Sequence, residues 1–591
     1  MGCAAPRYLY RFKDAATMRK QKILAITRDK EFLSSLIVAS SRLNIEVQSF
    51  ENVPSKELLE KPWHAVLVDI EGMEHDGVLT LSWVKSLSPL SLRCLVLSSL
   101  EPQLILKAIN EAKVHHILLK PVFPKELESW LKEIGGKIGV QTFPFIFAAA
   151  VENKTGKNYG HGYRVAQYAL AVGHQIRLSE SQLNALQIGC LLHDTGKLLL
   201  PESLILTDEA EREGMHPASF QHSLFGEQIA KNLGLTKEVL GVIRHHHERW
   251  DGEGYPDRLK GEAIPLLARI AAVTNIYDHL TERNEGEKAL THSEINQLLE
   301  SEAGFAFDPF VIKALMSLRE KEDVTKVLEQ IDQLPALAPL VQRALVLLER
   351  DDFDWQEVTD VISQDQNLAA QVLRLANSAM TGLRRKVTSL STALKVLGAR
   401  PIKNLLLTLS VRPLLQASAN LRLWEHSLTC ALVTKELAKR TQLIDPEEAF
   451  TAGLLHDIGK VVLARNFKQS YKRAIEIAQL QECPLFVAER LVFSISHAEV
   501  GAWLLERWRI PSTFCKAVAM HHDKVSETQT LAWHLCWANQ IIHIALEDYP
   551  SNRWISTVGI APKALHPLIV NSEQLVKSAL NQAKSIEAFW S

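Results

Sequence analysis

Short apolar runs alternate with amphipathic stretches in the first part of the chain, over residues 22–135. Four of these runs are ILAI (23–26), AVLVDI (65–70), CLVLSS (94–99) and HILLK (116–120). Consecutive apolar and β-branched positions are typical of parallel strands buried on both faces, and the stretches between them have helical periodicity. The pattern therefore predicts a doubly wound α/β domain.

Helical periodicity replaces the strand signals farther along the chain. The charged stretch EKEDVTK (320–326) and the proline-containing stretch LPALAP (334–339) mark a join between two helical regions. The predicted fold is multidomain: an α/β doubly wound domain followed by two all-α helical domains. We expect a disordered leader at 1–20, the α/β domain at 21–138, helical domains at 139–322 and 323–545, and a tail at 546–591.

The composition is that of an ordinary globular protein, and it narrows the classes of function. Of the 591 residues, 47% are hydrophobic and 23% are charged, and the formal net charge is -2. A chain without excess positive charge lacks the electrostatic basis for binding long nucleic acids, although a local cluster can still bind a small phosphate ligand. We therefore expect no long nucleic acid among the partners.

Cysteine usage and apolar run lengths predict a cytoplasmic protein that makes no membrane contact. The seven cysteines lie far apart and form no CxxC pair, which is typical of reduced thiols. Apolar runs such as FPFIFAAAV (143–151) reach about half of the ~20 residues that span a bilayer. Residues 1–17 have no signal-peptide core.

Polar side chains stand at the carboxyl ends of three predicted strands. These residues are Asp69, Ser98 and Lys120, and the functional groups of a parallel sheet gather at that edge. An acceptor aspartate, a hydroxyl residue and a lysine before proline, in this order, resemble a response-regulator receiver domain. The resemblance implies phosphorylation at Asp69, and it makes signalling proteins the expected partners of this domain.

One part of the receiver pattern is missing. Receivers carry an acidic pair after the first strand that binds the magnesium needed for phosphoryl transfer, whereas this chain has Thr27-Arg28-Asp29 there. Arg28 would place a positive charge near the cation, and at best one carboxylate remains. Two interpretations stay open: a phosphorylated receiver, and a partner-binding scaffold in which Asp69 is a polar strand-end residue. The missing pair favours the scaffold.

Histidines accompanied by an aspartate recur across the first helical domain. The candidate metal ligands are His161, His193, Asp194, His222, His246 and His247. Imidazole and carboxylate groups are common ligands of transition metals. In LLHDTGK we expect His193, Asp194 and Lys197 to share one helical turn, so that the aspartate bridges two cations while the lysine neutralises a phosphate oxygen.

The spacing of these residues resembles the HD phosphohydrolase superfamily, and HHERWDGEGYP (246–256) resembles the loop of its HD-GYP members. HGYRV (161–165) and ARIAAVTNIYDHLT (268–281) agree with the same family. The resemblance implies a helical bundle that binds two transition-metal ions, iron or manganese, and hydrolyses cyclic di-GMP or, in some relatives, cyclic GMP-AMP. It also implies that Asp194 and Lys197 are the catalytic residues.

The same resemblance implies which residues contact the substrate. Gly252, Gly254 and Pro256 are expected to form a rigid turn that permits close approach, and Tyr255 is expected to line the substrate site. Of a basic run that binds nucleotide phosphates in relatives, only Arg283 is retained, among acidic neighbours. The expected substrate-binding residues are therefore Gly254, Tyr255, Pro256 and Arg283.

Two substitutions depart from the family pattern at the metal. Asn275 stands where relatives carry a metal-binding aspartate. As a ligand it offers an amide oxygen without charge, so metal affinity should fall, and a site with one ion instead of two becomes an alternative. Lys157 stands where some relatives have the glutamate that binds a third metal, so a three-metal site is not expected.

The second helical domain repeats this ligand pattern without the Gly-Tyr-Pro loop. It contains, in order, His426, His456, Asp457, His497, His521 and His522. Upstream, RLANSAM (374–380) and TSLSTALKVLGARPIKNLL (388–406) resemble an HDOD domain, a family of signalling scaffolds without an established reaction. We expect His456 and Asp457 to join helices by hydrogen bonds rather than to catalyse, and the domain to bind partner proteins.

Two functions of different classes remain for the whole chain. The leading hypothesis is a bacterial signal-transduction enzyme, a metal-dependent phosphodiesterase that hydrolyses a cyclic dinucleotide. The alternative is a catalytically degenerate regulatory scaffold that binds a cyclic dinucleotide or partner proteins. Asn275 and the missing acidic pair favour the scaffold, whereas the retained histidines favour the enzyme. A (p)ppGpp-type phosphohydrolase agrees less well with the Gly-Tyr-Pro loop.

Overall fold

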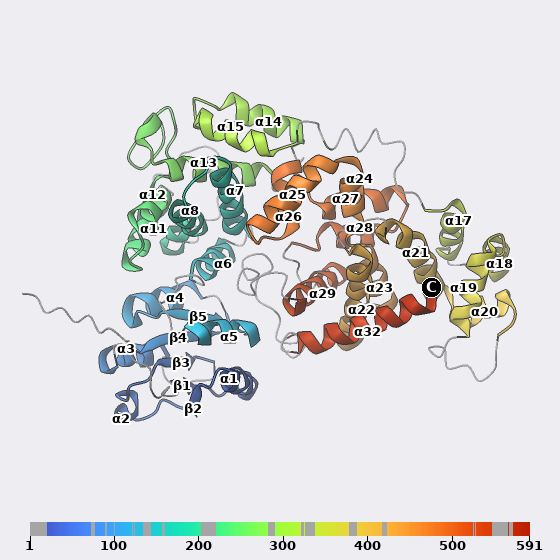
Figure 1. Cartoon of the computed structure of the whole chain (residues 1–591), viewed down its shortest axis with the longest axis horizontal. Helices are drawn as coiled ribbons and strands as arrows, with labels where there is room; N and C mark the ends of the chain where they lie inside the picture. Colours follow the sequence, from blue (N-terminus) through green and yellow to red (C-terminus); the bar gives the residue numbers. More distant parts are fainter. Residues whose placement is uncertain are drawn as a thin grey trace, which may run out of the picture. The chain divides into compact units, whose positions relative to one another are not determined.

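The computed structural model resolves most of the chain into two compact units (Figure 1). Unit 1 comprises residues 1–99 and 104–140, and unit 2 comprises residues 100–103 and 141–591. The structure describes residues 21–71, 77–88, 91–99, 101–120, 122, 124–133, 143–155, 160–201, 220–281, 290–320, 324, 337–350, 352–377, 387–416, 422–523, 525, 528–546, 565 and 571–590.

Unit 1 is built on a five-stranded parallel sheet with the order β2-β1-β3-β4-β5. The strands are β1 (Lys22–Ile26), β2 (Glu46–Phe50), β3 (Ala65–Asp69), β4 (Leu92–Leu97) and β5 (His116–Leu119). The helices are α1 (Lys30–Arg42), α2 (Lys56–Leu59), α3 (Gly77–Leu87), α4 (Pro102–Lys107), the π-helix η1 (Ala108–Ala112) and α5 (Pro124–Glu133). This is a doubly wound order, in which the carboxyl ends of β1 and β3 flank the point where the order reverses.

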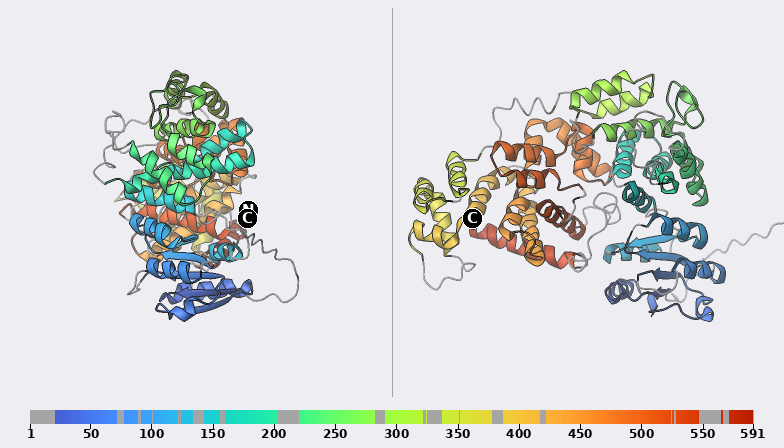
Figure 2. Two further views of the ribbon diagram at one scale, coloured as in Figure 1. Left: turned by 90° about the vertical axis from the view of Figure 1, so that its left-hand side faces the viewer. Right: turned by 180° about the vertical axis from the view of Figure 1, so that it is seen from behind.

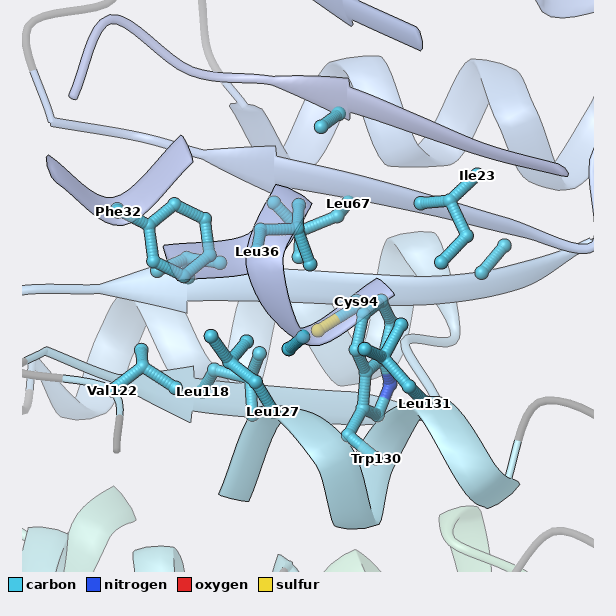
Figure 3. Close-up of a cluster of buried hydrophobic side chains, with 14 of the residues drawn as sticks. Ile23, Phe32, Leu36, Leu67, Cys94, Leu118, Val122, Leu127, Trp130 and Leu131 are labelled. Atoms are coloured by element: carbon cyan, nitrogen blue, oxygen red, sulfur yellow. The ribbon is translucent and has the colours of Figure 1, made fainter. Parts of the chain in front are cut away.

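One hydrophobic core of unit 1 lies between the sheet and helices α1 and α5 (Figure 3). Leu67 and Cys94 project from the central strands towards Leu36 of α1 and Trp130 of α5, and all four are buried. Every residue of β3 and β4 is buried, whereas the edge strand β2 is partly exposed. The apolar runs in the sequence therefore correspond to strands covered on both faces.

Unit 2 is helical; its described residues form no strand apart from an isolated bridge between Ala303 and Phe307 (Figure 2). Its first half contains α6 (Phe143–Thr155), α7 (His161–Gln175), α8 (Glu180–Leu192), the 3₁₀ turn η2 (Thr195–Leu199), α11 (Gln221–Asn232), α12 (Lys237–His245), η3 (Gly261–Ala263), α13 (Leu266–Thr281), α14 (His292–Ser301) and α15 (Pro309–Leu318).

The second half of unit 2 has two groups of helices. The upstream group is α17 (Pro339–Leu348), α18 (Trp355–Ile362), α19 (Gln366–Ala376), α20 (Leu390–Leu397) and α21 (Ala399–Gln416). The downstream group is α22 (Leu423–Thr441), α23 (Pro446–Leu455), α24 (Ile458–Asn466), α25 (Lys468–Leu480), α26 (Leu485–Phe493), α27 (His497–Arg507), α28 (Ser512–Ala519), α29 (Thr530–Leu546) and α32 (Ser572–Trp590).

Hydrogen bonds from buried side chains join the two halves of unit 2. The hydroxyl of Tyr277 on α13 donates to the backbone carbonyl of Arg490 on α26, at 2.6 Å. The guanidinium of Arg319, which is 2% exposed, donates to the hydroxyl of Ser494 at 2.6 Å. The helices of the first half are therefore held against α26 by polar as well as apolar contacts.

Two whole-chain expectations can be compared directly with the structure. The six cysteines in the described part of the chain are buried free thiols, which agrees with the expectation of reduced cysteines. A search of the same residues finds no helix with both the length and the apolar character needed to cross a membrane.

Candidate metal centre

Three histidines in the first half of unit 2 converge on one point. They are His222 on α11 and His246 and His247 at the end of α12, and their ligand atoms lie within 4.8 Å of one another. The Nε2 atom of His222 is 3.3 Å from Nε2 of His246 and 3.1 Å from Nε2 of His247. Burial holds the pKa values of His246 and His247 well below the usual range, so both imidazoles are neutral and can act as ligands.

A second group of ligand atoms comes from His161, His193 and Asp194, again within 4.8 Å of one another. Asp194 also reaches the first group: its Oδ1 is 3.6 Å from Nε2 of His222, and its Oδ2 is 3.5 Å from Nε2 of His193. One carboxylate thus offers one oxygen to each group. This arrangement suits a pair of cations that share a bridging ligand.

Three of the histidine rings are oriented by a hydrogen bond from their other nitrogen. Nδ1 of His193 and Nδ1 of His246 donate to backbone carbonyls three residues earlier, at 2.7 and 2.8 Å. Nδ1 of His161 donates to the carboxylate of Asp278 at 2.8 Å. Among the described residues, the buried Nε2 atoms of His161 and His193 have no hydrogen-bond partner. Such atoms fit metal ligands, because a cation would supply the missing interaction.

Asp278 is a buried carboxylate beside the cluster that the sequence analysis did not single out. Arg164 binds it with two nitrogens, at 2.7 and 2.8 Å. Burial favours its neutral form, but Arg164 and His161 hold the pKa of Asp278 below its usual range. An ionised carboxylate behind His161 fixes the ring and makes it a more basic ligand. The signal in the sequence was the position of Asp278 one helical turn after Asn275.

The HD dipeptide lies at the end of a helix, and the expectation of one continuous helical turn was wrong. Helix α8 ends before His193, and the 3₁₀ turn η2 begins after Asp194. Gly196 explains the change, because a Cβ atom there would lie 1.8 Å from the carbonyl oxygen of His222. The backbone of η2 packs directly on α11, and this contact brings Asp194 beside His222.

Lys197 still reaches the centre from this turn. Its Nζ lies 2.9 Å from Oδ2 of Asp194, and its side chain is 17% exposed. Although burial alone would raise the pKa of Asp194, Lys197 and His193 hold it well below the usual range. Asp194 is therefore an anionic candidate ligand.

The Gly-Tyr-Pro loop closes tightly beside the histidines, as the sequence predicted. A Cβ atom at Gly254 would lie 2.3 Å from the backbone nitrogen of Arg249, so no larger residue fits this position. Glu248 accepts hydrogen bonds from two backbone N–H groups of the loop, at 2.7 and 3.0 Å. The ring of Tyr255 stacks on His247 with centroids 4.7 Å apart. The half-exposed Tyr255 thus forms a wall next to the ligand cluster.

Asn275 lies on α13, and its Oδ1 is buried without a hydrogen-bond partner among the described residues. An unsatisfied amide oxygen at this position is consistent with a neutral ligand. Arg283 and Lys157, two further positions singled out in the sequence, lie outside the described residues.

In unit 1, Asp69 is fully buried and paired. Lys120 lies with its Nζ 2.8 Å from Oδ2 of Asp69 and 2.8 Å from Oδ2 of Asp29. The side chain of Arg28 donates hydrogen bonds to Asn52 and to the backbone carbonyl of Glu51, just after β2. The positive charge beside Asp69 is that of Lys120.

A further carboxylate was missed at the same edge of the sheet. Glu71 accepts a hydrogen bond from the hydroxyl of Ser98, and its Oε2 lies 3.3 Å from Nζ of Lys120. Ser98 and Lys120 therefore do meet at the carboxyl ends of the strands, as expected. The acidic partners of Lys120 come from the ends of β1 and β3 together.

A cavity of about 1400 Å³ lies elsewhere, between α17, α18, α21 and the turn that follows α27. Its lining carries both charge signs, with Arg343 and Lys403 near Glu349 and Asp360. None of the histidine ligands in the described chain lines it. The metal chemistry of the chain is therefore separate from this cavity.

Comparison with known proteins places two families along unit 2. Residues 146–311 match the family model of the HD domain, and residues 334–524 match that of the HDOD domain. These matches fall within the two helical domains that the sequence predicted.

Curated relatives match about a third of this chain. An uncharacterized protein of Treponema pallidum is 30% identical over 33% of this chain and 38% of its own length. The cyclic di-GMP phosphodiesterase response regulator RpfG of Xanthomonas campestris pv. campestris is 35% identical over 29% and 45%. The 3'3'-cGAMP-specific phosphodiesterase 2 of Vibrio cholerae is 31% identical over 29% and 33%. The matches span less than half of each relative. The two family models show that the chain contains an HD domain followed by an HDOD domain.

Proposed function

We propose that the HD domain is a metal-dependent phosphodiesterase that hydrolyses a cyclic dinucleotide, with cyclic di-GMP as the first candidate substrate and cyclic GMP-AMP as the second. The observation that carries this proposal is Asp194, whose two oxygens face two ligand clusters. Relatives named as cyclic di-GMP and 3'3'-cGAMP phosphodiesterases support the substrate class.

The ligand set fits two ions of iron or manganese, since imidazoles are combined with a shared carboxylate. The ligands would be His161, His193, Asp194, His222, His246 and His247, with Asn275 as a neutral addition. Ions bound there would polarise a phosphate group and lower the pKa of a water molecule for attack on phosphorus. Because Asn275 carries no charge, one of the two ions would be held more weakly.

The remaining roles belong to side chains at the edge of the cluster. Lys197 is partly exposed beside Asp194, so its ammonium can approach a phosphate oxygen and offset the negative charge that develops during attack. Tyr255, fixed by the glycine turn and by stacking on His247, would line the substrate together with Gly254 and Pro256.

The other parts of the chain would regulate this activity. We infer that unit 1 is a receiver-like domain that responds poorly to phosphodonors, because only Asp29 remains where receivers carry the acidic pair that binds magnesium. The HDOD domain would bind signalling partners.

The experiment uses the full chain, purified without oxygen and supplied with manganese or ferrous iron. We expect hydrolysis of cyclic di-GMP or cyclic GMP-AMP, and a loss of roughly a hundredfold or more in the double variant His193→Ala, Asp194→Ala. His174→Ala is the matched control, because this half-exposed histidine is on the last turn of α7, away from the ligands.

Two results would contradict the proposal. A wild-type chain that stays metal-free with both ions supplied cannot use this chemistry. A chain that binds metal and cyclic dinucleotide but does not cut it is a sensor, the alternative that the neutral side chain of Asn275 favours.

A further inference from the structure

The HDOD domain contains the complete donor set of the HD centre a second time. Its members come from α22, α27 and the ends of α23 and α28, and are His426, His456, Asp457, His497, His521 and His522. They form two groups of three, each with ligand atoms within 4.8 Å of one another.

The distances in the two domains agree closely. Oδ1 of Asp457 is 3.2 Å from Nε2 of His497, against 3.6 Å for the corresponding pair in the HD domain. Nε2 of His522 lies 3.0 Å from Nε2 of His497, against 3.1 Å. Lys460 pairs with Asp457 at 2.7 Å, against 2.9 Å. The HDOD domain therefore reproduces the geometry as well as the residue types.

The backbone beneath the ligands is repeated too. A Cβ atom at Gly459 would lie 2.0 Å from the carbonyl oxygen of His497, just as one at Gly196 would lie 1.8 Å from that of His222. In both domains a glycine two residues after the aspartate allows the chain to pack against the helix that carries the next histidine. This contact brings Asp457 beside His497.

Buried polar atoms in this cluster lack partners. Among the described residues, Nε2 of His521 and Oδ1 of Asp457 form no hydrogen bond. His521 is fixed through its other nitrogen, which donates to the carbonyl of Val518 at 2.6 Å. Burying such atoms without a partner is unfavourable. The expectation that His456 and Asp457 only join helices leaves these two atoms unexplained, whereas a cation would satisfy them.

Glu489 supplies an outer carboxylate to the cluster. Its Oε2 accepts a hydrogen bond from Nδ1 of His497 at 2.5 Å, and the side chain of Glu489 is fully buried. A carboxylate behind an imidazole is the usual arrangement that orients a metal-binding histidine. The unsatisfied nitrogen of His521 and this carboxylate are independent observations that point to a cation.

The second cluster is more enclosed than the first. The side chain of Asp457 is 1% exposed, whereas that of Asp194 is 15% exposed. The ring of Phe486 stacks on His522 with centroids 4.3 Å apart, as Tyr255 does on the HD domain's histidine pair. Phe486 is 4% exposed and belongs to α26, so a buried apolar ring takes the place of a half-exposed loop.

We propose that the HDOD domain holds a second centre for first-row transition-metal ions, enclosed beneath Phe486, which stabilises the domain and does not hydrolyse substrate. The proposal does not depend on the phosphodiesterase activity of the HD domain, because it concerns metal binding by a separate set of ligands.

The test uses the full chain with His193→Ala and Asp194→Ala, so that the HD centre is silenced. Manganese binding is measured by equilibrium dialysis with metal analysis, and cobalt binding by its visible absorption. We expect about one to two equivalents of metal. Adding His521→Gln, which preserves size, should weaken binding at least tenfold. His534→Gln is the matched control, because His534 is a buried histidine of the same domain outside the cluster.

The melting temperature separates loss of metal from loss of folding. Without metal, the His521→Gln and His534→Gln chains should both unfold in one cooperative transition. Manganese should raise the melting temperature only in the chain with His521 intact. The metal site is refuted if the silenced chain binds neither ion, or if both glutamine variants bind equally. The claim that the second centre does not hydrolyse substrate is refuted if the silenced chain cuts cyclic di-GMP and His521→Gln removes that activity.

Discussion

As a proposed ligand, Asn275 would limit the negative charge that the HD centre can present to bound metal ions. Asp194 is the anionic member of this cluster, and burial lowers the pKa values of His246 and His247 beside it. Two dications would therefore share little compensating charge, and the more weakly held ion limits occupancy.

Replacing this amide by a carboxylate should strengthen the centre. In Asn275→Asp we expect tighter binding of the second ion and turnover raised by about tenfold or more where occupancy is limiting. Metal titration and hydrolysis rates are compared with wild type under the same metal supply. The equivalent change Asn539→Asp, made in the HDOD domain, is the control and should leave turnover unaltered. Equal metal affinity and equal rates in Asn275→Asp would show that residue 275 is not a ligand.

Glu152 makes the stability of the HD domain depend on pH. Its carboxyl group is buried and accepts hydrogen bonds from the backbone N–H groups of Gly160 and Gly162, at 2.9 and 3.3 Å. Burial raises its pKa from 4.5 to about 8. Between these values the folded state keeps a proton that the unfolded state has lost, so the free energy of unfolding falls as pH rises.

The variant Glu152→Gln should remove this dependence. We expect the wild-type free energy of unfolding to decline between about pH 5 and pH 8, and the variant to decline less over the same window. Urea denaturation of metal-free protein at several pH values measures both. Glu180→Gln, at an exposed position on α8, should behave as wild type. Parallel curves for Glu152→Gln and wild type would mean that Glu152 titrates near its ordinary pKa.

For individual residues, type and spacing in the sequence identified the histidines as candidate ligands, but not the side chains that orient them. The ligands recur at characteristic intervals, so a family resemblance can identify them. Arg164 and Asp278 are 114 positions apart and meet only when α7 packs on α13. Such partners belong to no local pattern, and their roles became visible only from the fold.

Among the secondary-structure elements, the strands with uniform burial were predicted best. The apolar runs coincide with β1, β3, β4 and β5, whereas the edge strand β2 (EVQSF) was not recognised because exposed and half-buried positions alternate along it. The end of α8 was also misplaced. There the packing of Gly196 on α11 overrides a sequence that reads as continuous helix.

The Gly-Tyr-Pro loop gives a prediction for a whole element. In Gly254→Ala the new Cβ would lie 2.3 Å from the backbone nitrogen of Arg249, so the loop must move and carry Tyr255 away from its stacked position. We expect KM to rise by about tenfold or more with metal content unchanged. Steady-state kinetics and metal analysis of the full chain test this.

Gly261→Ala provides a matched control nearby. Gly261 has a positive φ of 58° but nothing within 4 Å of a Cβ atom, so the change adds backbone strain without a clash. It should cost about 1 kcal/mol of stability and leave KM unaltered. If Gly254→Ala behaves in the same way as Gly261→Ala, the position of Tyr255 does not govern substrate binding.

In the whole molecule, buried side chains of the HD domain donate hydrogen bonds to groups of the HDOD domain. Tyr277 and Arg319 of the HD domain are buried, and they donate to Arg490 and Ser494 of the HDOD domain. Composition predicts a join near residue 322, but it does not predict these contacts, because they link residues far apart in the chain. The polar groups lie at the surface that a cut at the join would expose.

A fragment of residues 139–322 should therefore be less stable than the same domain in the full chain. Losing a neutral hydrogen bond typically costs about 1 kcal/mol, and losing one from a charged group costs about 1.5–3 kcal/mol. Chemical denaturation, followed by the fluorescence of a label placed on α8, compares the two. Tyr277→Phe in the full chain removes one donor and should cost about 1 kcal/mol. Equal stabilities of fragment and full chain would show that the contacts contribute nothing.

The hydroxyl of Tyr277 also bears on how such chains can be recombined. It donates to two main-chain carbonyls in the last turn of α26, at 2.6 and 3.2 Å. The same helix carries Phe486 and Glu489, which contact the histidine cluster of the HDOD domain. A hybrid that attached a different output module after residue 322 would have to offer matching acceptors at the same place. The HD domain of this chain therefore cannot be combined freely with other output domains. We expect the HD and HDOD domains to be inherited together.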